Sequence, residues 1–246
     1  VSPNGLNINQ NAGSTSPQVL ADRVIAEKAD LGVAFDGDGD RVVMVDHLGN
    51  VLDGDEILYI IASDRLRQNV EFGGVVGTQM SNLGLQLGLD ALGVPFTRAP
   101  VGDRYVTQEM IKRGWSLGGE SSGHVICLDL SCTGDGIISA LQALAAVVNG
   151  GKSLADLRTQ MSKLPQKMIN VRISRGIELV GNSAIASAVQ QVEAELGARG
   201  RVLLRPSGTE PVLRVMVEGE DASDVARLAE QLAQALRDVA RDPHLG

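Results

Sequence analysis

The segment Asp36-Gly-Asp-Gly-Asp-Arg41 restricts what this chain can fold into more than any other part of it. An apolar run, Leu31–Phe35, precedes the segment, and a second run, Val42–Val45, follows it. Short apolar runs of this kind predict strands, so we expect the acidic segment to be a loop at a strand end. The glycines let a loop turn all three aspartates toward one point, whereas a strand would send alternate side chains to opposite faces.

Three carboxylates so close together repel one another unless a cation lies among them. Asp36, Asp38 and Asp40 offer only oxygen ligands, which suit a hard divalent ion, and Mg²⁺ is expected before Ca²⁺. Arg41 adds a fixed positive charge that could grip a phosphate beside the metal. The segment therefore predicts a magnesium site that faces a phosphate group.

Other readings of this segment are weaker. Asp-Gly is common in hairpin turns, but a turn requires only one such pair. An EF-hand requires Gly at its sixth position and Glu at its twelfth, where this chain has Arg41 and His47. A phosphatase of the haloacid dehalogenase type, with Asp36 as its nucleophile, stays open as an alternative, although a second acidic motif of that kind is missing.

The composition limits the class of protein. The chain has 246 residues, of which 43% are hydrophobic and only 2% aromatic, enough for one large domain or two ordinary ones built from aliphatic α/β layers. Its net charge of −8 argues against a nucleic-acid partner, and the lack of a long apolar run argues against a membrane partner. Cys127 and Cys132 lack metal-type spacing, which favours free thiols and a cytoplasmic protein.

Three regions follow one another along the chain. Residues 1–50 contain a short strand at Leu6–Ile8, a helix that Ser16 caps, and the acidic loop between two strands, too little for an independent domain. Residues 51–165 alternate helices and strands, which predicts βαβ units, a largely parallel sheet and ligand sites at the strand ends. Residues 166–246 read as a smaller α+β domain. The predicted fold class is thus α/β: a partial mixed-sheet domain, a complete α/β domain and a small C-terminal domain.

Three further loops carry residues suited to binding. Asp103 and Arg104 precede a predicted helix, and Glu120, Ser122 and His124 lie on a glycine-rich loop whose donors and acceptors suit a sugar. The hairpin connection from Arg205 to Pro211, followed by Arg214 on the next strand, suits a phosphate dianion. The candidate phosphate ligands are Arg205, Ser207, Gly208, Thr209 and Arg214.

Together these segments resemble the α-D-phosphohexomutase superfamily. Asp36–Arg41 resembles its metal loop, Gly119–His124 its sugar-recognition loop and Arg205–Pro211 its phosphate-binding loop, in the family's order. Segments such as Val101–Val106 and Thr133–Gly136 resemble most closely, in sequence, the bacterial members that act on glucosamine phosphates.

The resemblance implies a function. It implies interconversion of glucosamine 6-phosphate and glucosamine 1-phosphate through an active-site phosphoserine and a 1,6-bisphosphate, on the way to UDP-N-acetylglucosamine. Asp36, Asp38 and Asp40 would hold Mg²⁺, Glu120 and Ser122 would bind the sugar, and the phosphate loop would hold the non-reacting phosphate. Arg41 and His124 would support catalysis, with Asp103 and Arg104 nearby. The resemblance also allows a homodimer of the full-length enzyme.

The departures from the family limit this reading. The family's phosphoserine lies in an N-terminal domain that nothing here resembles, so we expect the C-terminal part of a four-domain enzyme: residues 1–50 the end of domain 2, residues 51–165 domain 3 and residues 166–246 domain 4. Such a chain is expected to bind metal and phosphosugar weakly and to turn over nothing alone. Ser121 replaces a common Gln of the relatives and could alter sugar preference. A phosphomannomutase, a phosphoglucomutase and a non-catalytic phosphosugar-binding module stay open as alternatives.

Overall fold

The computed structural model describes residues 2–172, 182–207 and 211–241, and the side chains up to residue 240. The chain divides into two compact units, Val1–Lys163 and Leu164–Gly246. The predicted α/β class is confirmed, because helices and strands alternate along the chain and the strands form three sheets. A further division near residue 50 stays a proposal.

The first sheet of the N-terminal unit consists of β1 (Leu31–Phe35), β2 (Val42–Asp46) and β3 (Val51–Leu52), which pair in antiparallel order. Helix α1 (Gln18–Glu27) packs against β1 and β2. Val42 pairs with Phe35, so the acidic segment is the loop that joins two antiparallel strands. This arrangement places the three aspartates at one end of the sheet.

Two local predictions in this region are wrong. Leu6–Ile8 forms turns rather than a strand, and Leu6 is 91% exposed, so no partner strand gives its apolar side chains a reason to extend. Ser16 does not cap α1. Pro17 occupies the cap position without a side-chain hydrogen bond, and the Ser16 amide instead donates to Gly13 O.

The second sheet has the order β5-β4-β6-β7. Strands β4 (Val75–Thr78), β5 (Phe96–Ala99) and β6 (Leu117–Gly119) are parallel, and β7 (Val125–Cys127) pairs with β6 in antiparallel order. Because parallel strands share their carboxyl ends, the loops after β4, β5 and β6 leave the sheet at one edge. The predicted ligand loops after β5 and β6 are two of these.

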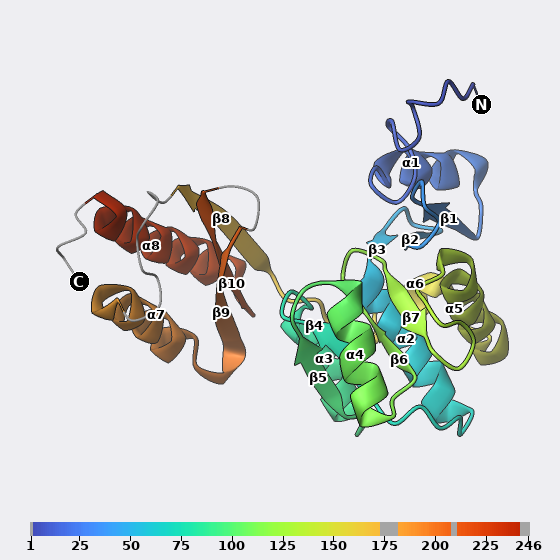
Figure 1. The fold of residues 1–246 in the computed structure, drawn as a ribbon. Helices are drawn as coiled ribbons and strands as arrows, with labels where there is room; N and C mark the ends of the chain where they lie inside the picture. Colours follow the sequence, from blue (N-terminus) through green and yellow to red (C-terminus); the bar gives the residue numbers. More distant parts are fainter. Residues whose placement is uncertain (1, 173–181, 208–210, 242–246) are drawn as a thin grey trace. The chain divides into compact units, whose positions relative to one another are not determined.

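Helix α2 (Gly54–Arg67) is the central helix of this unit (Figure 1). It contacts α3 (Leu83–Ala91), α5 (Gly136–Gly150), α6 (Leu154–Arg158) and strands of both sheets, while α4 (Asp103–Arg113) packs on β4, β5 and β6. Its residues from Gly54 to Ala62 are all buried, which explains the apolar run from Ile57 to Ala62. The largest fully buried side chains of the unit's core include Met44, Leu52, Ile57, Leu58, Ile61, Leu85 and Leu89.

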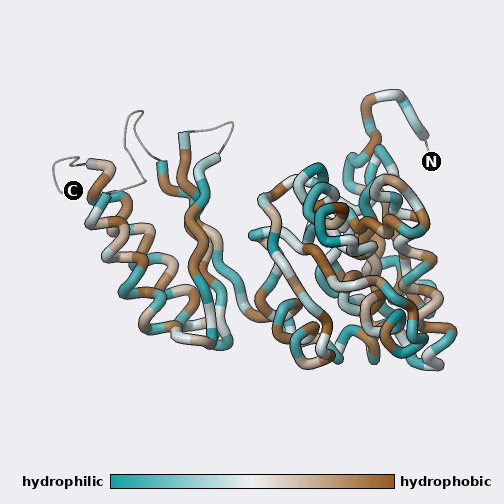
Figure 2. Tube along the Cα trace, turned by 60° about the horizontal axis from the view of Figure 1, so that its bottom comes forward, coloured by the Kyte–Doolittle hydropathy of each residue, from teal (hydrophilic) through white to brown (hydrophobic). Residues whose placement is uncertain are grey.

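The C-terminal unit contains a sheet of order β8-β10-β9, with β8 (Gln166–Arg172), β9 (Gly200–Pro206) and β10 (Val212–Gly219) antiparallel. Helices α7 (Ser183–Leu196) and α8 (Ala222–Arg241) pack on this sheet, and a short 3₁₀ turn, Gly197–Arg199, precedes β9. Figure 2 shows hydrophobic residues concentrated along the strands and alternating with hydrophilic ones along the helices. Leu213, Val215 and Val217 form the core with α7 and α8, so the intervening residues of β10 face the other side of the sheet.

A cross-strand ion pair on that other side of the sheet gives a stability prediction. Arg201 lies opposite Glu218 in the β9–β10 register, and its guanidinium pairs with the Glu218 carboxylate, which is fully buried. Gln166 supplies a second, weaker donor to the same carboxylate at 3.1 Å. We expect Arg201→Met to lower the free energy of unfolding by about 1–3 kcal/mol, because it leaves a buried charge without its main partner. Urea titration at pH 7 measures this loss, and an unchanged midpoint would contradict it.

Candidate functional site

The loop between β1 and β2 brings the three predicted metal ligands together. One carboxylate oxygen from each of Asp36, Asp38 and Asp40 lies within 4.8 Å of the other two. The loop has this shape because Asp36 Oδ1 accepts the amides of Gly39 at 3.1 Å and Arg41 at 3.2 Å. Gly39 has φ +75°, a conformation that glycine adopts without strain. The sequence of the loop therefore supplies both the ligands and the turn that converges them.

His124, directly before β7, contacts the Asp36–Arg41 loop. The imidazole is buried, and its Nδ1 lies 3.1 Å from Asp40 Oδ2. The space around the ring is tight, since a Cβ added at Gly134 would meet the imidazole. Asp40 Oδ1 and His124 Nε2 are buried without a hydrogen-bond partner among the described residues. A buried carboxylate oxygen without a hydrogen-bond partner suits the ligand shell of a cation.

Backbone contacts also fix the Glu120–His124 loop against the Asp36–Arg41 loop. Gly123 O accepts the Val42 amide at 3.0 Å, directly after Arg41. Gly123 has φ +95°, and a Cβ there would collide with the Val42 backbone. On the other side, the amide of Gly136, at the start of α5, donates to Gly39 O at 2.9 Å. The metal loop is thus held between the Glu120–His124 loop and the N-terminus of α5.

Glu120 is held by the loop after β5. Its Oε1 accepts the amide of Gly102 at 2.9 Å, where Gly102 occupies the cap position of α4 with φ +128°. Asp103 and Arg104 begin α4 and are exposed. Ser122 lies within the same loop as Glu120 and is exposed as well. The structure therefore brings the predicted sugar-binding residues Glu120, Asp103 and Arg104 to the shared edge of the parallel sheet.

The predicted phosphate residues lie in the C-terminal unit. Arg205 on β9 is directly opposite Arg214 on β10, so two like charges face each other across one strand pair. The Nε atoms of both are buried without a hydrogen-bond partner among the described residues. Ser207 follows β9, and its amide donates to Val212 O at 2.9 Å. Gly208 and Thr209 lie outside the described residues.

Two neighbouring arginines repel each other, and directly opposed like charges destabilise a strand pair. An anion between them removes that repulsion and satisfies their donors. The arrangement therefore suits a phosphate.

Two models of one protein family match most of the chain. Residues 53–164 match the family described as phosphoglucomutase/phosphomannomutase, alpha/beta/alpha domain III, and residues 168–235 match the C-terminal domain of the same family. The chain belongs to the phosphoglucomutase/phosphomannomutase family. Among the described residues of this family member, no helix is both long and apolar enough to cross a membrane.

Individual relatives define the match more closely. The chain is 58% identical over 233 residues to the phosphoglucosamine mutase of Aeromonas salmonicida. The alignment covers 95% of this chain and 52% of that relative. It is 56% identical over 234 residues to the phosphoglucosamine mutase of Hahella chejuensis. That alignment covers 95% of this chain and 53% of the relative. The chain therefore spans about half the length of the curated relatives it matches.

Solved structures share the fold at lower identity. The N-acetylphosphoglucosamine mutase of Aspergillus fumigatus, determined in complex with GlcNAc-6P and magnesium, superimposes with a TM-score of 0.77 at 21% identity, covering 94% of this chain and 57% of that one. A phosphoglucomutase/phosphomannomutase family protein of Burkholderia thailandensis gives a TM-score of 0.70 at 21% identity, covering 93% and 51%. The phosphohexomutase fold expected from the sequence is confirmed.

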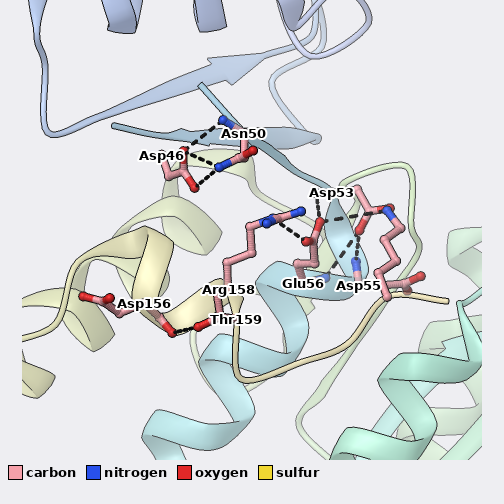
Figure 3. A network of polar contacts seen from close by, with 9 residues as sticks. Asp46, Asn50, Asp53, Asp55, Glu56, Asp156, Arg158 and Thr159 are labelled. Atoms are coloured by element: carbon pink, nitrogen blue, oxygen red, sulfur yellow. Dashed lines mark hydrogen bonds and ion pairs between the residues drawn. The ribbon is translucent and has the colours of Figure 1, made fainter. Parts of the chain in front are cut away.

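Sequence reasoning did not single out one polar cluster of this family member, at the N-terminus of α2. Asp53, Asp55 and Glu56 lie close together there, and Glu56 pairs with Arg158, the last residue of α6 (Figure 3). Arg158 Nε lies 3.0 Å from Glu56 Oε1, but its N–H is not aimed for a hydrogen bond, so the contact is an ion pair only. Burial raises the pKa of the Glu56 carboxyl, and the charge of Asp53 adds to the effect. The closely spaced acids Asp53, Asp55 and Glu56 were the only signal in the sequence.

Asp55 makes the pH dependence of this cluster testable. Burial raises the pKa of the Asp55 carboxyl to about 7, with the charge of Asp53 as the second cause. The folded state thus keeps a proton that the unfolded state has already lost, so stability is expected to fall as the pH rises from about 4 to about 7. We expect wild type to lose about 3 kcal/mol from this group over that range, while Asp55→Asn lacks this loss. Parallel urea titrations at pH 5 and pH 8 test it, and equal pH slopes for the two proteins would contradict it.

Proposed function

We propose that this chain supplies the metal-, sugar- and phosphate-binding parts of a phosphoglucosamine mutase, which interconverts glucosamine 6-phosphate and glucosamine 1-phosphate. The observation that carries the proposal is the direct attachment of the metal loop to the sugar loop, through Asp40–His124 and through the amide of Val42 on Gly123 O. A mutase requires this proximity, because the phosphoryl group must meet both the metal and the sugar hydroxyl.

Asp36, Asp38 and Asp40 would hold Mg²⁺, a choice supported by their clustered carboxylate oxygens and by the buried oxygen of Asp40 that lacks a partner. When bound, the ion would neutralise negative charge on the phosphoryl group being transferred. His124 would keep Asp40 in its ligand position. Arg41 would add a second positive charge beside the same phosphoryl group.

Glu120 would accept a hydrogen bond from a ring hydroxyl of the sugar. The amide of Gly102 holds one of its oxygens, which orients the carboxylate so that the other can receive the sugar. Ser122, Asp103 and Arg104 would complete this contact surface. The non-reacting phosphate would bind Arg205, Ser207 and Arg214, together with Gly208 and Thr209. A clamp that grips either phosphate equally suits a bisphosphate intermediate, whose two ends must exchange places.

A chimera tests the proposal. This chain replaces the matching 233 residues of the Aeromonas salmonicida phosphoglucosamine mutase, and the rate is measured on glucosamine 6-phosphate, glucose 6-phosphate and mannose 6-phosphate. We expect the glucosamine substrate to react fastest. The same chimera with Asp38→Asn serves as the control for background enzymes.

Three results would favour the other functions. Faster turnover of glucose or mannose phosphate would favour a phosphoglucomutase or phosphomannomutase, a choice on which Ser121 bears because it lies next to Glu120. A folded chimera that binds phosphosugar without turnover would favour a binding module. Release of inorganic phosphate that depends on a phosphorylated Asp36 would favour the phosphatase alternative.

A further inference from the structure

The N-terminus of α2 lies next to the sugar loop as well as the acidic cluster. The amide of Gly54, the first residue of α2, donates to Ser121 O at 3.1 Å. The contact is close, because a Cβ on Gly54 would collide with Glu120 O and would lie 2.8 Å from Gly123 N. The orientation of the first turn of α2 therefore sets where the backbone from Glu120 to Gly123 lies.

Asp53 sets the orientation of that first turn. Its Oδ1 accepts the amides of Asp55 at 3.1 Å and Glu56 at 3.4 Å, and its own amide donates to Glu56 Oε2 at 3.1 Å. This reciprocal capping box satisfies amides that a helix start otherwise leaves open. A change in the Asp53 carboxylate is thus transmitted to the same turn that carries Gly54.

Lys163, at the C-terminal end of this unit, holds the Asp53 carboxylate. Its ammonium group pairs with Asp53 Oδ2 and lies 3.9 Å from Glu56 Oε2. Burial by itself would lower the pKa of Lys163, but the charges of Asp53 and Glu56 hold it above its usual value. Lys163 is also the last residue of the N-terminal unit, directly before the chain continues into the C-terminal unit.

We propose that Lys163 is a positioning residue for the sugar site, which acts through Asp53 and the first turn of α2 on the Glu120–Gly123 loop. The role rests on the proposed function of that loop. Among the residues that the structure describes, Lys163 forms its ion pairs with Asp53 and Glu56 and not with a predicted substrate-binding residue. Through Asp53, the last residue of the N-terminal unit is therefore connected to the backbone that carries Glu120.

Amide hydrogen exchange on the 246-residue chain tests the proposal without relying on activity. The variants are Lys163→Met, which keeps the length of the side chain but removes its charge, and Lys163→Arg, which keeps the charge. Lys152→Met is the matched control, because Lys152 is exposed and its replacement changes the net charge by the same amount. NMR-detected exchange is followed at Gly54 and Gly123, and at Gly136, whose amide binds the metal loop without involving Asp53.

We expect Lys163→Met to speed exchange at Gly54 and Gly123 about tenfold, since a charged hydrogen-bond partner of the cap is lost. Gly136 should change by less than about twofold, Lys163→Arg should restore slow exchange, and Lys152→Met should have no effect. Unchanged exchange at Gly123, or an equal rise at Gly136, would overturn the proposal.

A second readout separates this inference from the proposed function. Binding of glucosamine 6-phosphate to the unchanged chain is measured by calorimetry, and Lys163→Met is expected to weaken it about threefold. Absence of binding to the unchanged chain would count against the proposed function, and the exchange data would still decide the role of Lys163. Equal binding by wild type and Lys163→Met would overturn the positioning role.

Discussion

Asp38→Asn is expected to weaken Mg²⁺ binding by the chain about 100-fold, because it removes one of three converging carboxylates and one of their charges. Asp38 is the cleanest of the three to change, since its side chain is exposed. Asp36 also organises the loop through its bonds to Gly39 and Arg41, and Asp40 contacts His124. Isothermal titration with MgCl₂ measures the effect directly.

Asp30→Asn is the matched control for this measurement. Asp30 is exposed, lies outside the loop and carries the same charge, so its loss should leave Mg²⁺ affinity within about twofold. In the chimera, Asp38→Asn should reduce the turnover rate by at least the factor by which it weakens Mg²⁺ binding. Full Mg²⁺ affinity in Asp38→Asn would show that the three aspartates do not form a metal site.

Arg214→Met is expected to have opposite effects on binding and on stability. Phosphate affinity should fall about 10- to 100-fold, because a charge-assisted hydrogen bond is lost. The free energy of unfolding should stay equal or rise by about 0.2–1 kcal/mol, since Arg205 no longer faces a like charge. Titration with glucosamine 6-phosphate followed by NMR, together with urea unfolding, measures both effects.

Arg172→Met is the control for this pair of measurements, as Arg172 is exposed on β8 and its loss changes net charge equally. Arg201→Met gives the contrast, because that arginine pairs with a buried glutamate and should cost stability. Destabilisation of Arg214→Met to the same degree as Arg201→Met would mean that Arg214 supports the sheet rather than a ligand.

The sequence predicted the alternation of helices and strands correctly where the apolar periodicity was strong. It did not reveal β6, Leu117–Gly119, which lies inside the parallel sheet but contains two glycines and is only three residues long. Glycine has a low strand propensity, so this strand forms because β4 and β7 pair with it on both sides. The strand expected at Leu6–Ile8 failed for the converse reason, since apolar residues alone form no strand without a partner.

The sequence by itself determined the shape of the Asp36–Arg41 loop, because its three aspartates and its turn-forming glycines lie within five residues of one another. Local hydrogen bonds from Asp36 are enough to converge them. Only the tertiary structure decided the contacts between distant segments, such as Glu120 with Gly102 and Lys163 with Asp53. The last two residues are 110 positions apart. Such contacts depend on sheet order and strand register, and these are set by how the whole core packs rather than by any short motif.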